Sequence, residues 1–333
     1  MRTIQGIRFG LFAMLILAAT ACGGGAAEEE GSGEEALSGA VQVDGSSTVF
    51  PITEAVAEEF QIANPETRIT VGVSGTGGGF KRFCAGETDV ADASRPIKDS
   101  ERELCEENGV GFTELTVAWD GLSAVTHPSN DFVDCLTVDE LKAIWEPGSQ
   151  IGNWSEVRAG FPDKELKLYG PGTDSGTFDY FTESIVGEED ASRPDYTASE
   201  DDNVLVQGVK ADPGALGYFG YAYYEENAED LKLLGVDGGS GCVQPTVQTI
   251  ESGTYAPLSR PLYIYASDQG MAKPQVEAFI EFFLTQGAEL VRAVGYIPLK
   301  AEQYADELEK ARGFAAGGGA EAPVSEADTA GSR

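Results

Sequence analysis

The sequence predicts an α/β protein with two domains. From residue 41 onward, short apolar runs typical of strands alternate with amphipathic runs typical of helices, which is the rhythm of a parallel sheet covered by helices. At 333 residues the chain is longer than one hydrophobic core usually organises. Segments rich in glycine and hydroxyl residues also stand where predicted strands pass into helices, at the sheet edge where such proteins bind ligands.

The N-terminal residues have the pattern of an export signal. Two arginines flank the start of an apolar run, Leu11 to Ala19, which is too short for a comfortable membrane span. We therefore predict a signal peptide over residues 1–21. The small residues before Cys22 resemble a bacterial lipoprotein box, although alanine stands where leucine is usual, and we expect Cys22 to be lipidated. Ordinary signal cleavage is the alternative. A Gly- and Glu-rich disordered tether is predicted over residues 22–37.

The first half of the predicted domain region alternates regularly. Apolar β-prone runs predict strands at 40–44, 68–75, 88–94 and 110–128, the last as one long strand or two abutting ones. Amphipathic runs predict helices at 51–65, 78–86 and 100–109, the first with Pro51 at its start.

The second half is less regular. A helix followed by a polar loop is predicted over 136–157, and further strands at 165–170 and 260–267. Helices are predicted at 175–187 and within 273–299, and a helix, turn, strand and second helix over 203–227. Trp119, Trp145 and Trp154 are interpreted as packing residues rather than as a carbohydrate platform. Residues 313–333 are predicted to be a disordered tail.

The charge balance excludes some partners. With 56 acidic and 22 basic residues, the formal net charge is −34. Such a field argues against binding nucleic acid or an anionic membrane surface by general electrostatics. It also means that any anion site must depend on local donors.

Four cysteines remain after Cys22. In an exported chain they predict two disulfides with three possible pairings, of which we favour Cys84–Cys105, close in sequence, and Cys135–Cys242, across a long insertion. A metal site is the alternative, but C-x-x-C spacing is missing and His127 is the only histidine.

Three strand-to-helix junctions share one chemistry. They are DGSSTVFP (44–51), SGTGGGFK (74–81) and GTDSGTF (172–178), and a fourth segment, ADASRP (91–96), offers a hydroxyl beside an arginine. Backbone N–H groups and hydroxyls at a helix N-terminus favour an anion. Any single junction is more often a plain helix cap. Four together indicate a site for a small oxyanion.

Enzyme motifs fit less well. A nucleophile elbow needs G-x-S-x-G, and the segment before Ser175 has one residue too many. His127, followed by proline, is the only candidate base, and nothing in the sequence places it near Ser175. The P-loop and G-x-G-x-x-G patterns are absent. No enzyme activity, cofactor or resident metal is predicted.

Taken together, the four segments resemble the phosphate-binding component of high-affinity phosphate ABC transporters. The resemblance covers roughly residues 40–311 and includes ALGYFGYAYY (215–224). It implies a two-lobed, class II periplasmic-binding-protein-like fold in which each lobe is a central sheet flanked by helices. Phosphate would be held in the interlobe cleft. The lobes would comprise 38–120 plus 262–312, and 121–261.

The resemblance also implies ligand-binding positions. The residues that match it directly are Ser47, Thr48, Val49, Phe50, Ser74, Thr76, Gly77, Ser175, Gly176 and Thr177. Two positions depart from the family pattern: Ser94 stands where an aspartate accepts the proton of phosphate, and Pro171 stands near the place of an arginine. We expect Arg95 to supply the missing cation. Asp174 either pairs with Arg95 or accepts the phosphate proton.

The implied function is that of an exported solute receptor, lipid-anchored through Cys22, that captures inorganic phosphate. It would pass phosphate to the permease of an ABC transporter, act as a monomer and bind no nucleic acid. Since Ser94 removes the usual proton acceptor, a receptor for another tetrahedral oxyanion, sulfate or molybdate, is the first alternative. A secreted phosphate-ester hydrolase is the second.

Overall fold

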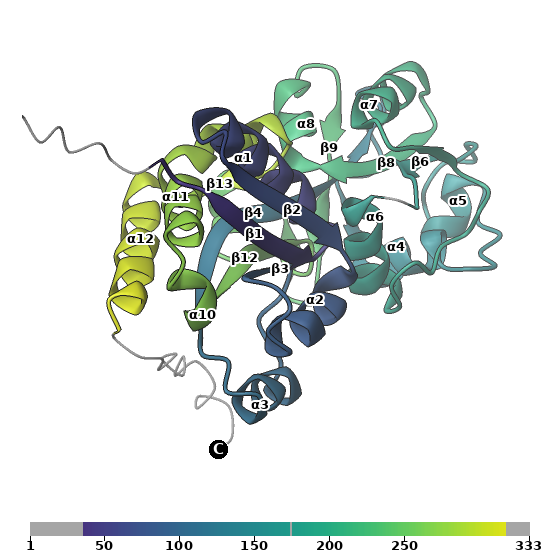
Figure 1. Cartoon of the computed structure of the whole chain (residues 1–333). Coiled ribbons are helices and arrows are strands. Elements are labelled where there is room, and N and C mark those ends of the chain that lie inside the picture. The colour runs from purple at the N-terminus through teal and green to yellow at the C-terminus, as the bar shows by residue number, and fades with distance from the viewer. Residues whose placement is uncertain (1–35, 174, 318–333) are drawn as a thin grey trace, which may run out of the picture. The chain divides into compact units, whose positions relative to one another are not determined.

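The computed structural model describes residues 36–173 and 175–317 (Figure 1). The predicted signal peptide, the lipidation site Cys22, nearly all of the tether and Asp174 lie outside the described residues, as do residues 318–333.

The described chain alternates strands and helices in the predicted manner. Its strands are β1 (Gly39–Gly45), β2 (Thr67–Val73), β3 (Val90–Ala93), β4 (Phe112–Thr126), β5 (Cys135–Thr137), β6 (Lys167–Pro171), β7 (Thr197–Ser199), β8 (Ala215–Gly220), β9 (Lys232–Leu233), β10 (Gly235–Asp237), β11 (Cys242–Val243), β12 (Ser259–Ser267) and β13 (Ile297–Pro298). Its helices are α1 (Phe50–Ala63), α2 (Gly75–Cys84), α3 (Asp99–Glu107), α4 (Val138–Trp145), α5 (Trp154–Val157), α6 (Gly176–Phe181) with the π-helical turn η1 (Thr182–Val186), α7 (Asp202–Ala211), α8 (Tyr221–Glu226), α9 (Val247–Glu251), α10 (Asp268–Met271), α11 (Pro274–Ala293) and α12 (Ala301–Ala315).

The main sheet is mixed rather than parallel throughout. Its strand order is β2-β1-β3-β12-β4-β8-β6-β7, with β13 and β9 also pairing with β4. Pairing is parallel within β2-β1-β3 and within β8-β6-β7, but β12 is antiparallel to both β3 and β4, and β4 is antiparallel to β8. The prediction of a parallel sheet is therefore wrong for β4 and β12. Strand β4 takes the chain from the β1–β3 half of the sheet to the β6–β8 half, and β12 brings it back, so the two strands run antiparallel.

Strand β4 joins two halves of the structure. Its residues up to Gly121 pair with β12, and from Leu122 onward they pair with β8. Each half has its own apolar core. One is built around α1 and α11, where Phe60 and Phe279 meet edge to face at 5.5 Å. The two-lobed α/β fold is confirmed.

The second core is rich in aromatic rings. Phe181 stacks on Tyr218 with ring centroids 3.7 Å apart, and Trp145 meets Tyr218 edge to face at 4.8 Å. Trp145 and Trp154 are 1% and 0% exposed. Both tryptophans are therefore core residues, as predicted, and Trp119 packs partly buried against both cores.

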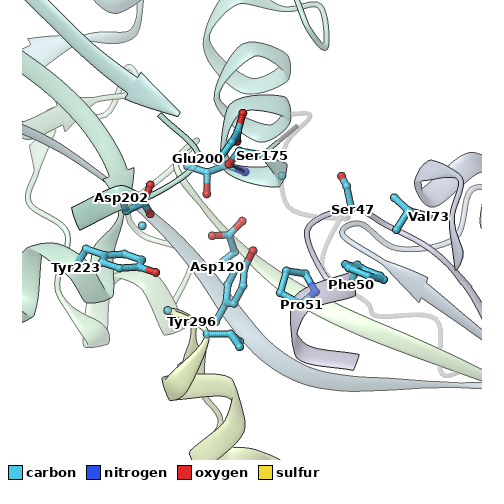
Figure 2. Close-up of a pocket in the computed structure, with 15 residues that line it drawn as sticks. Ser47, Phe50, Pro51, Val73, Asp120, Ser175, Glu200, Asp202, Tyr223 and Tyr296 are labelled. Carbon is cyan, nitrogen blue, oxygen red and sulfur yellow. Dashed lines mark hydrogen bonds between the residues drawn. The ribbon is translucent and has the colours of Figure 1, made fainter. Parts of the chain in front are cut away.

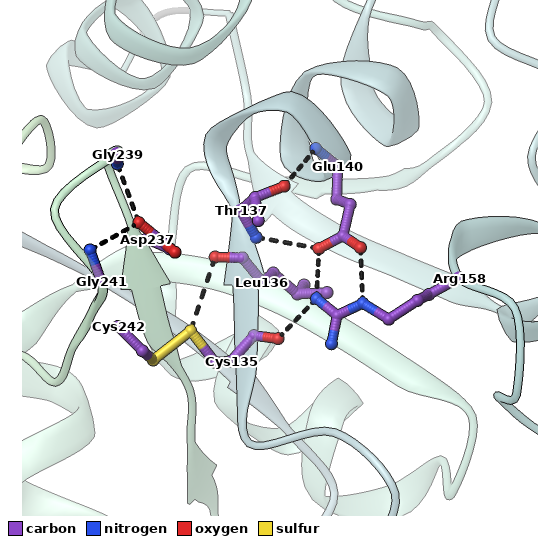
Figure 3. Close-up of a disulfide and its surroundings, with 9 residues drawn as sticks. All are labelled: Cys135, Leu136, Thr137, Glu140, Arg158, Asp237, Gly239, Gly241 and Cys242. Carbon is purple, nitrogen blue, oxygen red and sulfur yellow. Dashed lines mark hydrogen bonds and ion pairs between the residues drawn. A yellow bond between two sulfur atoms is a disulfide. The ribbon is translucent and has the colours of Figure 1, made fainter.

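Both favoured disulfides are present. Cys84 and Cys105, fully buried, tie α2 to α3. Cys135 and Cys242, 107 residues apart in sequence, join β5 to β11 (Figure 3). The second bond closes residues 135–242 into one covalent loop.

Helix α12 was not predicted from the sequence. It spans Ala301–Ala315 and so includes the first residues of the predicted tail, which was expected to begin at residue 313. Within residues 36–173 and 175–317, no helix has both the length and the apolarity needed to cross a membrane.

Candidate functional site

Three of the four sequence-predicted segments follow neighbouring strands. Strand β1 lies between β2 and β3, all three parallel, with Gly45 paired to Val73 on one side and to Asp92 on the other. Because parallel strands end at the same edge, the segments after β1, β2 and β3 come together there. The sequence prediction of one shared edge is supported at these positions.

The loop after β1 is held by its own hydrogen bonds. The N–H of Ser46 donates to the carbonyl oxygen of Asp92 at 3.0 Å, and the N–H of Thr48 donates to Oγ of Ser46 at 3.2 Å. Val49 is fully buried, so its side chain belongs to the core, and any contact of this residue with a ligand would be through its backbone. Phe50 begins α1, with Pro51 in the first turn, where a missing N–H costs nothing.

The segments after β2 and β3 contact each other. Oγ1 of Thr76 and Oγ of Ser94 lie 3.1 Å apart, and the N–H of Ser94 donates to Oγ1 of Thr76 at 3.2 Å. The hydroxyl of Ser74 instead donates to the carboxylate of Asp44, which also pairs with Arg82. Ser74 therefore has its proton engaged by the protein.

Arg95, the expected cation, already has a counter-ion. Its two terminal nitrogens each donate to a carboxylate oxygen of Glu101 at 2.8 Å, and its guanidinium lies 5.7 Å from the ring centroid of Phe80. This pairing raises the pKa of Arg95 and, despite burial, lowers the pKa of Glu101. Gly77 lies beside the guanidinium, since a Cβ built there would stand 3.7 Å from Nη2 of Arg95.

The third junction meets the first. Ser175 caps α6 by accepting a hydrogen bond from the N–H of Thr177 at 3.2 Å. Oγ1 of Thr48 lies 3.4 Å from the carbonyl oxygen of Gly176. A Cβ at Gly176 would stand 2.6 Å from Cα of Thr48, closer than real Cβ atoms approach, so this contact requires glycine. Segments more than a hundred residues apart thus pack backbone against backbone.

A pocket of about 550 Å³ lies at this contact (Figure 2). Its lining residues are Ser47, Phe50, Pro51, Val73, Asp120, Ser175, Gly176, Thr177, Glu200, Asp202, Gly220, Tyr223, Val294, Gly295 and Tyr296. Five of these were predicted from the sequence: Ser47, Phe50, Ser175, Gly176 and Thr177. The other predicted residues that the structure describes, Thr48, Val49, Ser74, Thr76, Gly77, Ser94 and Arg95, are not among the lining residues.

Three lining carboxylates were not predicted. Figure 2 shows Asp120 between the Ser47–Phe50 side and the Asp202–Tyr223 side of the pocket. Burial raises the pKa of Asp202 to about 7. Burial also raises the pKa of Asp120, although the positive charge of Arg260 and its hydrogen bond oppose this shift. Glu200 is the third carboxylate. Among 56 acidic residues these gave little signal, although an aspartate inside the apolar run of β4 could have drawn attention.

Two further charged residues bind the first loop. Oγ of Ser47 donates to Oδ2 of Asp179 at 2.7 Å, and Nη2 of Arg260 donates to Oγ1 of Thr48 at 3.0 Å. Both were missed. Asp179 lies one turn into a helix and Arg260 at the start of a strand, where charged residues are ordinary, and only the tertiary structure brings them to the loop.

Metal and hydrolytic chemistry find little support in the described residues. In the part of the chain that the structure describes, no group of three His, Cys, Asp or Glu side chains is arranged to hold a metal ion. The ring of His127 is bonded to its neighbour Ser129, with Nδ1 2.8 Å from Oγ, and it is not among the pocket residues.

Comparison with known proteins gives a consistent picture. Residues 30–286 match the PBP superfamily domain. The chain is 51% identical over 267 residues to protein SphX of Synechocystis sp., covering 79% of this chain and 80% of that protein. It is 39% identical to the phosphate-binding protein PstS of Staphylococcus saprophyticus, covering 87% of this chain and 88% of that protein. The crystal structure of a possible phosphate-binding protein from Planctomyces limnophilus matches with a TM-score of 0.80 and 50% identity, over 84% of this chain and 99% of that one.

Proposed function

Because this chain belongs to the PBP superfamily and to the family of the PstS phosphate-binding proteins, we propose that it is a phosphate receptor of an ABC transporter. It captures inorganic phosphate outside the cytoplasm and delivers it to the membrane permease. The observation that carries the proposal is the contact between the Ser47–Phe50 loop and the Ser175–Thr177 cap at one pocket. Ser47 from one segment and Ser175 and Thr177 from the other line this pocket, an arrangement that suits a tetrahedral oxyanion held between two lobes.

The ligand set is part of the proposal. Around phosphate we assign Ser47, Thr48, Val49 and Phe50 from the first loop and Ser175, Gly176 and Thr177 from the α6 cap. Thr76, Gly77 and Ser94 would contribute from the neighbouring strand ends, where Thr76 and Ser94 are already hydrogen-bonded. Ser74 and Arg95 would have to exchange their present partners, Asp44 and Glu101, to contact the ligand.

Binding without catalysis is also proposed. Oγ of Ser175 accepts the N–H of Thr177 as a helix cap, and the ring of His127 is bonded to Ser129. A serine nucleophile needs a base in hydrogen-bond reach, and neither contact supplies one. We therefore propose that the protein acts by closing its two lobes on the ligand, without cleaving a bond and without a cofactor.

The lobe boundaries follow the strand that joins the two halves. We assign residues 38–120 plus 262–312 to one lobe and 121–261 to the other. The change of partner in β4 between Gly121 and Leu122, and the register shift between Leu262 and Tyr263 in β12, support these boundaries. Two strands crossing between lobes are a natural hinge.

Membrane attachment through a lipid on Cys22 completes the proposal. A tethered monomer stays near its permease, which raises the effective concentration of the loaded receptor there. The net charge of −34 gives no long-range attraction for phosphate, so capture depends on the pocket itself.

Calorimetric titration of ligand-free protein with phosphate, arsenate and sulfate at pH 8 tests the function. We expect one-to-one binding of phosphate and arsenate and none of sulfate. Ser175→Ala should weaken phosphate binding about 10-fold or more. The matched control is Ser155→Ala, which alters an exposed serine near the start of α5. If none of the three oxyanions gave a heat of binding, the proposal would be refuted.

Sulfate is the one alternative that a specific observation favours. Ser94 stands where the family aspartate would reject a ligand without a proton, and its hydroxyl lies 3.1 Å from that of Thr76. Two adjacent hydroxyls can donate to sulfate as readily as to phosphate. Equal binding of sulfate in the same titration would select this alternative.

A further inference from the structure

Resting on the proposed function, we infer that Arg260 is a positioning residue of the oxyanion site: it orients the Thr48 hydroxyl as a donor and supplies the compensating positive charge. On the sequence alone, Arg95 is the residue expected to supply this charge.

The pocket is short of positive charge. Its lining residues, among those the structure describes, include Asp120, Glu200 and Asp202 but no lysine or arginine. Arg95 is paired with Glu101 through two hydrogen bonds of 2.8 Å, whereas Arg260 has one of 3.3 Å to Asp120, so Arg95 is the more tightly neutralised of the two. A buried dianion in such surroundings needs a cation within reach.

Arg260 has the required place. It stands near the start of β12, opposite Asp120 of β4 in the sheet register. Nη2 donates to Oγ1 of Thr48 at 3.0 Å, and Nε donates to Oδ2 of Asp120 at 3.3 Å. The guanidinium carbon lies 3.6 Å from the ring centroid of Tyr180, which belongs to α6. Three segments therefore fix one side chain: the first loop, the joining strand and the capped helix.

The hydrogen bond decides what Thr48 can do. A hydroxyl has one proton and two lone pairs, and Arg260 occupies one lone pair. The proton is left for another acceptor. Its present one, the carbonyl oxygen of Gly176, is at 3.4 Å, beyond the usual range for an O–H donor. Thr48 is 2% exposed and does not itself line the pocket, but its neighbour Ser47 and its contact Gly176 do, so its proton is available to a ligand oxygen that reaches this wall of the pocket.

Burial makes the charge effective. The side chains of Arg260 and Asp120 are 13% and 3% exposed, so water screens them little. Arginine suits this position because its planar fork can hold Thr48 and Asp120 at once while stacking on Tyr180. Lysine can keep the charge but not this geometry.

A double-mutant cycle on the full-length protein tests the inference, with phosphate as the probe in calorimetry at pH 8. Arg260→Met should lower phosphate affinity about 10- to 100-fold, and Arg260→Lys should recover part of the loss. In a Thr48→Val background the effect of Arg260→Met should shrink markedly, because the hydroxyl it orients is gone.

Two controls separate this role from a structural one. Arg158 forms an ion pair with Glu140 and lies 4.9 Å from the ring centroid of Phe161, beside the Cys135–Cys242 bond (Figure 3). Arg158→Met should leave phosphate affinity within about twofold of wild type. Arg95→Met tests the rival cation directly, and thermal unfolding of each variant reports damage to the fold.

The outcomes are distinct. Wild-type affinity in Arg260→Met, or full additivity with Thr48→Val, would overturn the inference, as would a large loss in Arg95→Met alone. Coupled loss with partial rescue by lysine would establish it. Absence of phosphate binding by the wild-type protein would instead overturn the proposed function, and the inference with it.

Discussion

The hydroxyl of Ser47 donates a hydrogen bond to Oδ2 of Asp179 at 2.7 Å, joining the loop before α1 to helix α6. The two residues are 132 positions apart in sequence. Burial raises the pKa of Asp179 to about 6, although the bond from Ser47 opposes the shift, and Asp190 and Glu189 add to it. This carboxyl therefore changes charge near pH 6, at the contact between the loop before α1 and helix α6.

Replacing Asp179 by asparagine should make the free energy of unfolding less dependent on pH. A raised folded-state pKa gives stability that is complete below the unfolded value of 3.8 and is lost as the pH rises through about 6. Because the group is only partly buried, we expect the loss to be about 1 kcal/mol. Urea unfolding at pH 4.5 and pH 7.5 measures it. Asp306→Asn, on the exposed side of α12, is the control, and equal pH slopes in all three proteins would contradict the prediction.

Gly176→Ala should impair closure. The added methyl would stand 2.6 Å from Cα and 2.8 Å from N of Thr48, and both are backbone atoms that cannot swing aside. We expect about a 10-fold or greater loss of phosphate affinity, with a smaller effect on the thermal midpoint. Gly313→Ala in α12 is the matched control, because nothing lies within 4 Å of the added atom. Unchanged affinity in Gly176→Ala would show that the contact is not part of the bound state.

Asp92→Asn should stabilise the protein at alkaline pH. Asp92 is fully buried, accepts a hydrogen bond from Thr53 at 2.9 Å, and its Oδ2 has no partner among the described residues. Burial raises its pKa to about 8, so its stabilising contribution fades as the pH rises from about 4 to 8. Asparagine keeps the acceptor for Thr53 and never ionises.

The difference in unfolding free energy between Asp92→Asn and wild type should therefore grow with pH, reaching about 2–4 kcal/mol at pH 8. Denaturant titrations at pH 5, 7 and 8 measure it. Parallel pH profiles for the two proteins would show that Asp92 does not titrate as its burial indicates.

Removing the Cys135–Cys242 disulfide should cost stability but not ligand binding. The bond spans 107 residues, and constraining so long a loop in the unfolded chain is worth about 2–5 kcal/mol. The Cys135→Ala, Cys242→Ala double variant should unfold at lower urea while its phosphate affinity stays near that of wild type, since neither cysteine lines the pocket. A fall in affinity as large as that of Ser175→Ala would mean that the disulfide shapes the site.

Local pattern determined much of this protein. The alternation of strands and helices and the burial of Trp145 and Trp154 could be predicted, because hydrophobic periodicity and aromatic size are properties of the local sequence. The cysteine count predicted two disulfides and left three pairings open, of which the favoured one is present. The same holds for the glycine and hydroxyl junctions, because a strand followed by a capped helix is a local arrangement that needs no partner.

Only the tertiary structure decided which of these residues meet. The hydroxyl of Ser47 donates to Asp179, and that of Thr48 contacts both Gly176 and Arg260. Arg95 pairs with Glu101 and does not line the pocket. The antiparallel course of β4 and β12 was likewise hidden, since a strand pattern has no direction until its neighbours are known. Charges are the least predictable part, because any of the 56 carboxylates can pair with any cation that folding brings near. The sequence determines how many charged residues there are, but only the folded structure determines which of them lie close enough to pair.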